Sequence, residues 1–217
     1  MASLKKNLKY TIKKAYLLQK DKIKARIKDF DNIYRNGTNE DIFAELVFCI
    51  LTPQSKAKNC WTAVENLKKN KLLWTGTYSR IAGKLNGVRF KNKKAKYIVE
   101  ARERFFDNIP IKSAVNIFPD NIKTRDYLVK NIKGIGYKEA SHFLRNIGRG
   151  GNLAILDRHI LKNLAVFNII KEVPSSISKN KYFDIEEKMN NFAEKIKIPV
   201  AHLDFLFWSK ETGEIFK

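Results

Sequence analysis

The sequence predicts an all-α fold. Apolar residues recur at helical spacing through most of the 217-residue chain, and the alternation of apolar and polar residues that is typical of strands is almost absent. Glycine and proline fall between these amphipathic segments, so they mark connections. We therefore expect roughly ten to eleven helices, without an internal repeat or a low-complexity tract.

The apolar stripes place the expected helices in order along the chain. Thr38 to Asp41 supply start signals for the first clear stripe, and the Thr52–Pro53 step ends it. The stripes run over residues 43–50, 57–67, 95–101, 128–132, 140–147, 160–166, 185–196 and 203–208.

Composition narrows the class of partner. Lys and Arg exceed Asp and Glu by enough to give a net charge of +21, while 44% of the residues are hydrophobic. A chain this rich in apolar residues folds, and its basic surface attracts nucleic acid first and anionic membrane second. The sequence has no apolar run of the roughly 20 residues that a membrane helix needs and no signal-peptide core. We expect a cytoplasmic, nucleoid-associated protein that has no membrane partner and is monomeric.

The two cysteines argue against a metal cluster. Cys49 and Cys60 stand eleven residues apart, with no CxxC pair, which excludes a four-cysteine iron–sulfur or zinc site. His142 and His159 have no ligand constellation around them. We expect neither metal nor cofactor, and a reducing compartment.

The segment 128–141 (LVKNIKGIGYKEAS) predicts a helix-hairpin-helix. One helix ends at Ile132 and the next begins at Tyr137. Gly134 and Gly136 between them permit positive φ and a close approach to the backbone. The first N–H groups of the second helix suit a phosphate, so the motif is expected to hold DNA by its backbone without reading sequence.

Two residues near the hairpin carry chemistry. Lys138 opens the second helix, where the helix dipole disfavours its charge and favours the neutral, nucleophilic amine. Asp157 follows the apolar run Leu153–Leu156 and precedes a helix, which predicts an N-cap carboxylate. An ionised carboxylate there can stabilise a sugar cation or help to move protons.

These residues resemble the helix-hairpin-helix DNA glycosylase superfamily. The runs NIKGIGYKEASHFLRN (131–146), LDRHIL (156–161) and WSKETGEIFK (208–217), with Arg89–Phe90 and residues 94–99, are similar to the archaeal-type 8-oxoguanine DNA glycosylase/lyase family. The resemblance runs from about residue 40 to residue 217. It implies two helical lobes with the active-site cleft between them. A central bundle, 42–150, ends in the hairpin, and residues 1–41 plus 151–217 form the second lobe.

The resemblance also implies roles for individual residues. Lys138 would be the nucleophile and Asp157 its acidic partner in excision of 8-oxoguanine and cleavage of the abasic strand. Lys217 would supply the acceptor for the N7 hydrogen of 8-oxoguanine, and Trp208 would pack beside the extruded base. Gln54 and Phe90 are two candidates for the side chain that fills the gap in the duplex, and Arg89 is expected to contact DNA.

Two other functions remain open from the sequence. One is an endonuclease III-like glycosylase for oxidised pyrimidines, although many relatives of that enzyme carry a four-cysteine cluster. The other is a helix-hairpin-helix DNA-binding module without catalysis, which would leave Lys138 and Asp157 without a role.

Overall fold

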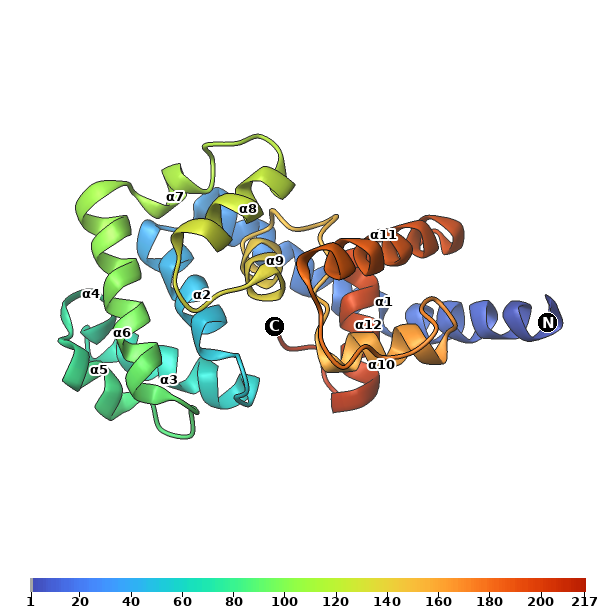
Figure 1. Cartoon of the computed structure of the whole chain (residues 1–217), viewed down its shortest axis with the longest axis horizontal. Helices are drawn as coiled ribbons and strands as arrows, with labels where there is room; N and C mark the ends of the chain where they lie inside the picture. The colour runs from blue at the N-terminus through green and yellow to red at the C-terminus, as the bar shows by residue number, and fades with distance from the viewer. Residues whose placement is uncertain (1) are drawn as a thin grey trace. The chain divides into compact units, whose positions relative to one another are not determined.

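The predicted all-α fold is confirmed. The computed structural model describes residues 2–217, apart from the side chains of residues 2–8 and 107. It contains twelve α-helices, one π-helix and no strand within those residues. The count exceeds the number of apolar stripes partly because α4 (Leu72–Thr75) and α7 (Ile111–Ala114) have four residues each, too few to show a period. Figure 1 shows the helices in chain order.

The chain divides into two compact units. One comprises the N-terminal segment through Phe30 together with Gly150–Lys217, and the other comprises Asp31–Arg149. We call them the terminal unit and the central unit. Helix α1 (Ala2–Asn36) contributes residues to both. The lobe boundaries predicted from the sequence, 42–150 and 1–41 plus 151–217, remain a prediction.

The central unit is built around α2 (Asn39–Leu51). Its residues 42–51 are all buried, and it contacts α3, α6, α7 and α9 (Figure 1). A capping box starts it: Thr38 Oγ1 accepts from the Asp41 N–H at 3.2 Å, and the Thr38 N–H donates to Asp41 Oδ2 at 3.1 Å. The remaining helices of the unit are α3 (Ala57–Lys69), α5 (Tyr78–Lys84), α6 (Lys91–Arg102), the π-helix η1 (Glu103–Asn108), α8 (Asn121–Asn131) and α9 (Tyr137–Asn146).

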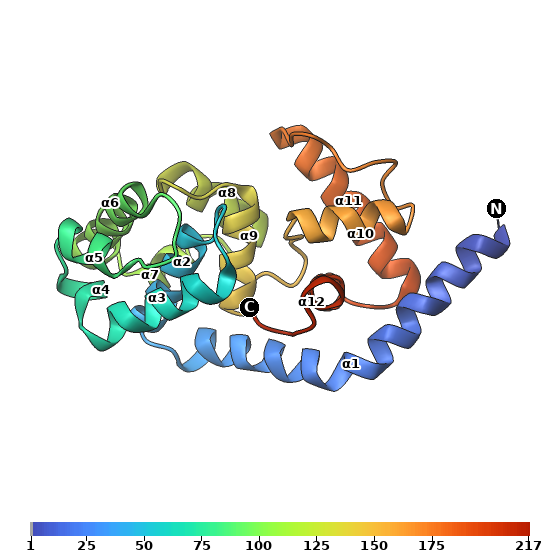
Figure 2. The same ribbon diagram turned by 90° about the horizontal axis from the view of Figure 1, so that it is seen from below.

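The terminal unit packs α12 (Val200–Thr212) against the N-terminal part of α1, α10 (Arg158–Val166) and α11 (Lys179–Ile196). Figure 2 shows α12 beside the long α1 helix. The Phe30 and Phe205 rings stack with centroids 6.0 Å apart, and the Ser209 hydroxyl donates to Gln19 Oε1 at 2.7 Å. Helix α12 is apolar on most of its sides, and these contacts bury it within the terminal unit.

Candidate active site

The hairpin has the predicted form, with α8 ending at Asn131 and α9 beginning at Tyr137. Gly134 has a φ of +89°, and a Cβ added to it would lie 2.3 Å from Cδ2 of Tyr97, which belongs to α6. Glycine is therefore required at this position for two reasons, the backbone conformation and the space. Gly136 does not use the positive φ that glycine permits, because its φ of −110° and ψ of −167° are extended.

A buried arginine joins the two helices of the hairpin. The Arg125 side chain is fully buried between α8 and α9, and its Nη1 donates to Ser141 Oγ at 3.1 Å. Its guanidinium carbon lies 5.6 Å from the centroid of the Tyr137 ring, the first residue of α9. Arg125 thus holds the start of the helix that carries Lys138.

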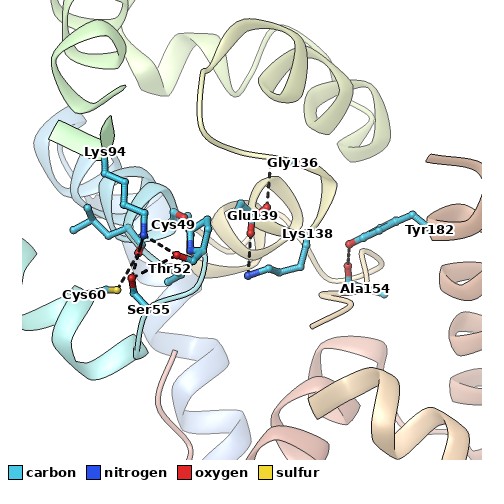
Figure 3. Close-up of polar contacts among 12 residues, drawn as sticks. Cys49, Thr52, Ser55, Cys60, Lys94, Gly136, Lys138, Glu139, Ala154 and Tyr182 are labelled. Atoms are coloured by element: carbon cyan, nitrogen blue, oxygen red, sulfur yellow. Dashed lines mark hydrogen bonds and ion pairs between the residues drawn. The ribbon is translucent and has the colours of Figure 1, made fainter. Parts of the chain in front are cut away.

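Lys138 lies at the start of α9, and its ammonium forms an ion pair with the next residue. Nζ of Lys138 is 3.0 Å from Oε1 of Glu139 (Figure 3). The other carboxylate oxygen, Oε2, accepts from the Gly136 N–H at 3.1 Å. One carboxylate therefore contacts both the hairpin backbone and the candidate nucleophile. Glu139 belongs to the sequence motif 128–141, but the motif alone predicts no role for it.

Asp157 caps α10, as predicted. Its Oδ1 accepts from the Ile160 N–H at 2.8 Å, and the preceding residues 153–156 are buried and lie outside any helix. Two side chains of α11 bind both backbone groups of Ala154 in that segment. The Tyr182 hydroxyl donates to the Ala154 carbonyl at 2.5 Å (Figure 3), and Glu186 Oε1 accepts from the Ala154 N–H at 2.8 Å. Tyr182 and Glu186 therefore fix the backbone that presents Asp157.

Gln54 lies in the turn between α2 and α3, and its φ is +56°. Phe90 has a similar φ, +57°, and its side chain is 57% exposed just before α6. Non-glycine residues in this region are strained by roughly 1–3 kcal/mol each, and such strain is typical of functional sites. The Arg89 guanidinium carbon lies 5.6 Å from the centroid of the Phe90 ring. The exposure of Phe90 is what an inserting side chain needs.

Lys94 connects these two turns. Its buried ammonium donates to the carbonyls of Leu51 and Pro53, both at 2.7 Å, and to Ser55 Oγ at 3.1 Å (Figure 3). The same Ser55 hydroxyl accepts from the Arg89 N–H at 3.0 Å. Lys94 therefore holds the backbone just before Gln54 and the Ser55 side chain just after it, and through Ser55 it is linked to Arg89, the residue before Phe90.

Burial is the largest influence on the pKa of Lys94 and lowers it. The nearby charges of Lys138 and Arg89 lower it as well, while Cys60 and Glu139 act in the opposite direction. Burial raises the pKa of the Cys60 thiol to about 11. The thiol, which lies 3.2 Å from the Leu51 carbonyl, is thus a protonated donor at neutral pH.

Trp208 and Lys217 belong to the terminal unit with Asp157. Trp208 lies on α12 and is partly exposed, between the buried Phe207 and Ser209. Helix α12 ends at Gly213, whose φ is +81°, and residues 214–217 are half-buried. Nζ of Lys217 lies 5.9 Å from the centroid of the Phe30 ring. The end of the chain therefore packs on its own unit.

The end of α12 is further tied to α10. Glu211 accepts from Lys162 at 2.6 Å and from the Asn163 amide at 3.2 Å. The hydrogen bond from Lys162 is the main reason that the pKa of Glu211 is lowered. This contact fixes the turn from which residues 213–217 leave the helix.

The sequence-predicted residues fall into three groups. The hairpin brings together Gly134, Gly136 and Lys138, and the Lys94 network brings together the turns that carry Gln54, Arg89 and Phe90. The terminal unit holds Asp157, Trp208 and Lys217. No group of three or more His, Cys, Asp or Glu side chains that could hold a metal ion occurs among residues whose side chains the structure describes. Over the same part of the chain, no helix is both long and apolar enough to cross a membrane.

The fold and the hairpin define the class: this is an all-α helix-hairpin-helix protein with a lysine at the start of the second hairpin helix. Residues 23–198 match the family model of the helix-hairpin-helix 8-oxoguanine DNA glycosylases. The chain belongs to that family.

Individual relatives agree with this assignment. The chain is 50% identical to the 8-oxoguanine DNA glycosylase/AP lyase of Fusobacterium nucleatum, over 99% of this chain and all of that protein. It is 41% identical to the enzyme of the same name from Methanocaldococcus jannaschii, over 91% and 93% of the two chains.

Solved structures give the same result. The Thermotoga maritima 8-oxoguanine DNA glycosylase superposes with a TM-score of 0.88 at 33% identity, covering 98% of this chain and all of that one. The Methanocaldococcus jannaschii 8-oxoguanine glycosylase/lyase in complex with a 15mer DNA containing 8-oxoguanine has a TM-score of 0.86 at 38% identity, with 96% of this chain and all of that one covered.

Proposed function

We propose that this protein excises 8-oxoguanine from double-stranded DNA and then cleaves the abasic strand by β-elimination through a Schiff base on Lys138. The observation that carries the proposal is the lysine amine at the start of the hairpin's second helix, in a chain of the 8-oxoguanine DNA glycosylase family. A glycosylase that used water alone would have no need of an amine there. The net charge of +21 supports a DNA substrate.

The proposed reaction begins at C1′ of the damaged nucleotide. The Lys138 lone pair forms the N–C1′ bond while the bond from C1′ to N9 of the base breaks, and the leaving base takes up a proton. Positive charge develops on the deoxyribose, and the Asp157 carboxylate offsets it. Asp157 accepts from the Ile160 N–H, which fixes its orientation for that role.

The Schiff base then permits strand cleavage. Opening of the sugar ring gives an iminium, which acts as an electron sink. Loss of a C2′ proton forms the C2′–C3′ double bond, and the C3′–O bond breaks with the electrons on the 3′ phosphate. Water finally hydrolyses the imine and restores the Lys138 amine.

We propose that residues of the terminal unit select the damaged base. Guanine N7 accepts a hydrogen bond, whereas N7 of 8-oxoguanine carries a hydrogen and donates. An acceptor at Lys217 would therefore favour the oxidised base, with Trp208 packing beside it. The packing of residues 214–217 on their own unit supports this role, because a free tail could not hold an acceptor in place.

DNA contacts are assigned to the central unit. The hairpin backbone at Gly134 and Gly136 would hold a phosphate, and Arg89 would contact the duplex. Gln54 or Phe90 would fill the space that the extruded base leaves.

We further propose that the protein acts as a monomer, in the cytoplasm at the nucleoid, without metal or cofactor. Light scattering with and without a bound duplex tests whether it is a monomer.

A panel of duplexes tests the function. Each carries one lesion: 8-oxoguanine, an oxidised pyrimidine or an abasic site, with undamaged guanine as the control. We expect excision of 8-oxoguanine and cleavage at the abasic site. Lys138→Gln should abolish borohydride trapping and keep DNA binding, whereas Asp157→Asn should slow excision with little loss of stability, because Asn caps about as well as Asp. Preference for the oxidised pyrimidine would favour the endonuclease III-like alternative, and no cleavage on any duplex would favour a binding module.

A further inference from the structure

Glu139 occupies the place where the hairpin would receive a DNA phosphate. Its Oε2 accepts from the Gly136 N–H at 3.1 Å, at the N-terminus of α9, and its side chain is only 13% exposed. A negatively charged oxygen on a backbone N–H at a helix start is the arrangement that such hairpins offer to phosphate. In the free protein an internal carboxylate therefore holds this donor.

The same carboxylate pairs with the candidate nucleophile. Its second oxygen, Oε1, is 3.0 Å from Nζ of Lys138 (Figure 3). A neighbouring carboxylate favours the protonated form of an amine, and an ammonium has no lone pair with which to attack C1′. The ion pair thus keeps Lys138 positioned and unreactive.

Other charged groups of the central unit act on the same pair. Lys94 of α6 interacts electrostatically with Arg89 and with the Cys60 thiol of α3, and also with both Lys138 and Glu139. The positive charges of Lys94 and Lys138 disfavour each other. Glu139 opposes their effect.

We propose that Glu139 is a positioning residue that couples DNA binding to the release of Lys138. A phosphate and the Glu139 carboxylate compete for one N–H and repel each other, so a bound phosphate displaces Oε2 from Gly136. Without its hydrogen bond to the Gly136 N–H, the carboxylate is no longer held beside Lys138. The Lys138 ammonium then loses a proton to solvent, and the neutral amine becomes the nucleophile. This inference rests on the proposed roles of the hairpin and of Lys138.

Glu139→Gln separates charge from structure. The glutamine oxygen still accepts from the Gly136 N–H, so the helix start is preserved. Glu100→Gln is the matched control, because Glu100 pairs with a different lysine of the hairpin, Lys133, at 3.2 Å. Both variants remove one negative charge beside the same motif.

Two readouts test the coupling. Glu139→Gln should bind an undamaged duplex several-fold more tightly than the wild type, since the competing anion is gone. Borohydride trapping on an abasic duplex should reach half its maximum about one pH unit lower, the smaller end of the effect of an adjacent opposite charge. Glu100→Gln should change both values much less. A purely structural role for Glu139 would lower the thermal midpoint and leave the pH profile in place.

The contrary outcomes are distinct. Unchanged affinity with an unchanged pH profile in a folded Glu139→Gln variant would overturn the coupling, and so would loss of trapping at every pH. Glu139→Ala serves as the second variant if glutamine is not tolerated, with the same two shifts expected. Failure of the wild type to trap, or trapping by Lys138→Gln, would instead count against the proposed function itself.

Discussion

Replacing Gly134 by alanine should damage the hairpin through two separable effects. An L-residue at a φ of +89° pays a backbone penalty of about 1–2 kcal/mol. The new methyl group would also lie 2.3 Å from Cδ2 and 2.8 Å from Cε2 of Tyr97, so the ring or the turn must move. Overpacking of this kind costs about 1–3 kcal/mol. We expect Gly134→Ala to lower the free energy of unfolding by about 2–5 kcal/mol and to weaken binding of an abasic duplex.

A double-mutant cycle, measured by urea unfolding, separates the backbone penalty from the clash with Tyr97. In a Tyr97→Ala background the clash is absent, so Gly134→Ala should cost only the backbone penalty of about 1–2 kcal/mol. Gly83→Ala is the control: it lies within α5 with nothing within 4 Å of an added Cβ, and alanine there should stabilise by about 0.5–1 kcal/mol. An equal cost for Gly134→Ala in both backgrounds would refute the role of Tyr97, and no cost in either would refute the account of the turn.

Three further predictions concern other parts of the site. Lys94→Met removes the three hydrogen bonds of a buried ammonium, so it should lower the free energy of unfolding in urea by about 2–4 kcal/mol and slow 8-oxoguanine excision. A stability loss with unaltered excision would contradict a role of Lys94 in positioning the Gln54 turn for the reaction. The Cys60 thiol has a pKa of about 11 in place of the ordinary 9.0, so its protonated form favours the folded state. This contribution to the free energy of unfolding should disappear as the pH rises from about 9 through 11. Iodoacetamide at pH 8 should label Cys60 only after unfolding. Deletion of Lys217 should reduce discrimination of 8-oxoguanine from guanine by about tenfold to a hundredfold, as expected for a buried donor left unpaired, and spare abasic-site cleavage; equal loss of both activities would contradict its role in base recognition.

The sequence was most informative where local rules decide the structure. Helical periodicity predicted the all-α fold, and the glycines between two amphipathic segments predicted the hairpin. Its second helix begins at Tyr137, as predicted, and its first helix ends at Asn131, one residue before the predicted Ile132. Thr38 and Asp157 were predictable as helix starts because capping depends on residues three positions apart.

Features that depend on the tertiary structure were not predictable. No local pattern distinguishes Lys94 from the other Lys and Arg residues, 43 in all, as the one buried against the turn that carries Gln54. The contacts of Tyr182 and Glu186 with Ala154 join positions about thirty residues apart, and no local pattern specifies them. Gly136 looked equivalent to Gly134 until the backbone angles separated them.

The first thirty residues contain a helical apolar pattern that was not recognised in the sequence. Helix α1 covers Ala2–Asn36, and four of its buried residues, Ile12, Tyr16, Ile23 and Phe30, are spaced at four and seven positions. That spacing was a readable signal, together with the absence of glycine and proline before residue 37. The many lysines between the apolar positions masked it.

Peptide mapping of the borohydride-trapped adduct tests the central claim most directly. The wild-type protein is incubated with a duplex that contains 8-oxoguanine, reduced with borohydride and digested, and the modified residue is located by mass spectrometry. The account predicts one sugar adduct, on Nζ of Lys138. An adduct on another lysine or on the N-terminal amine, or no adduct while 8-oxoguanine is released, would contradict it.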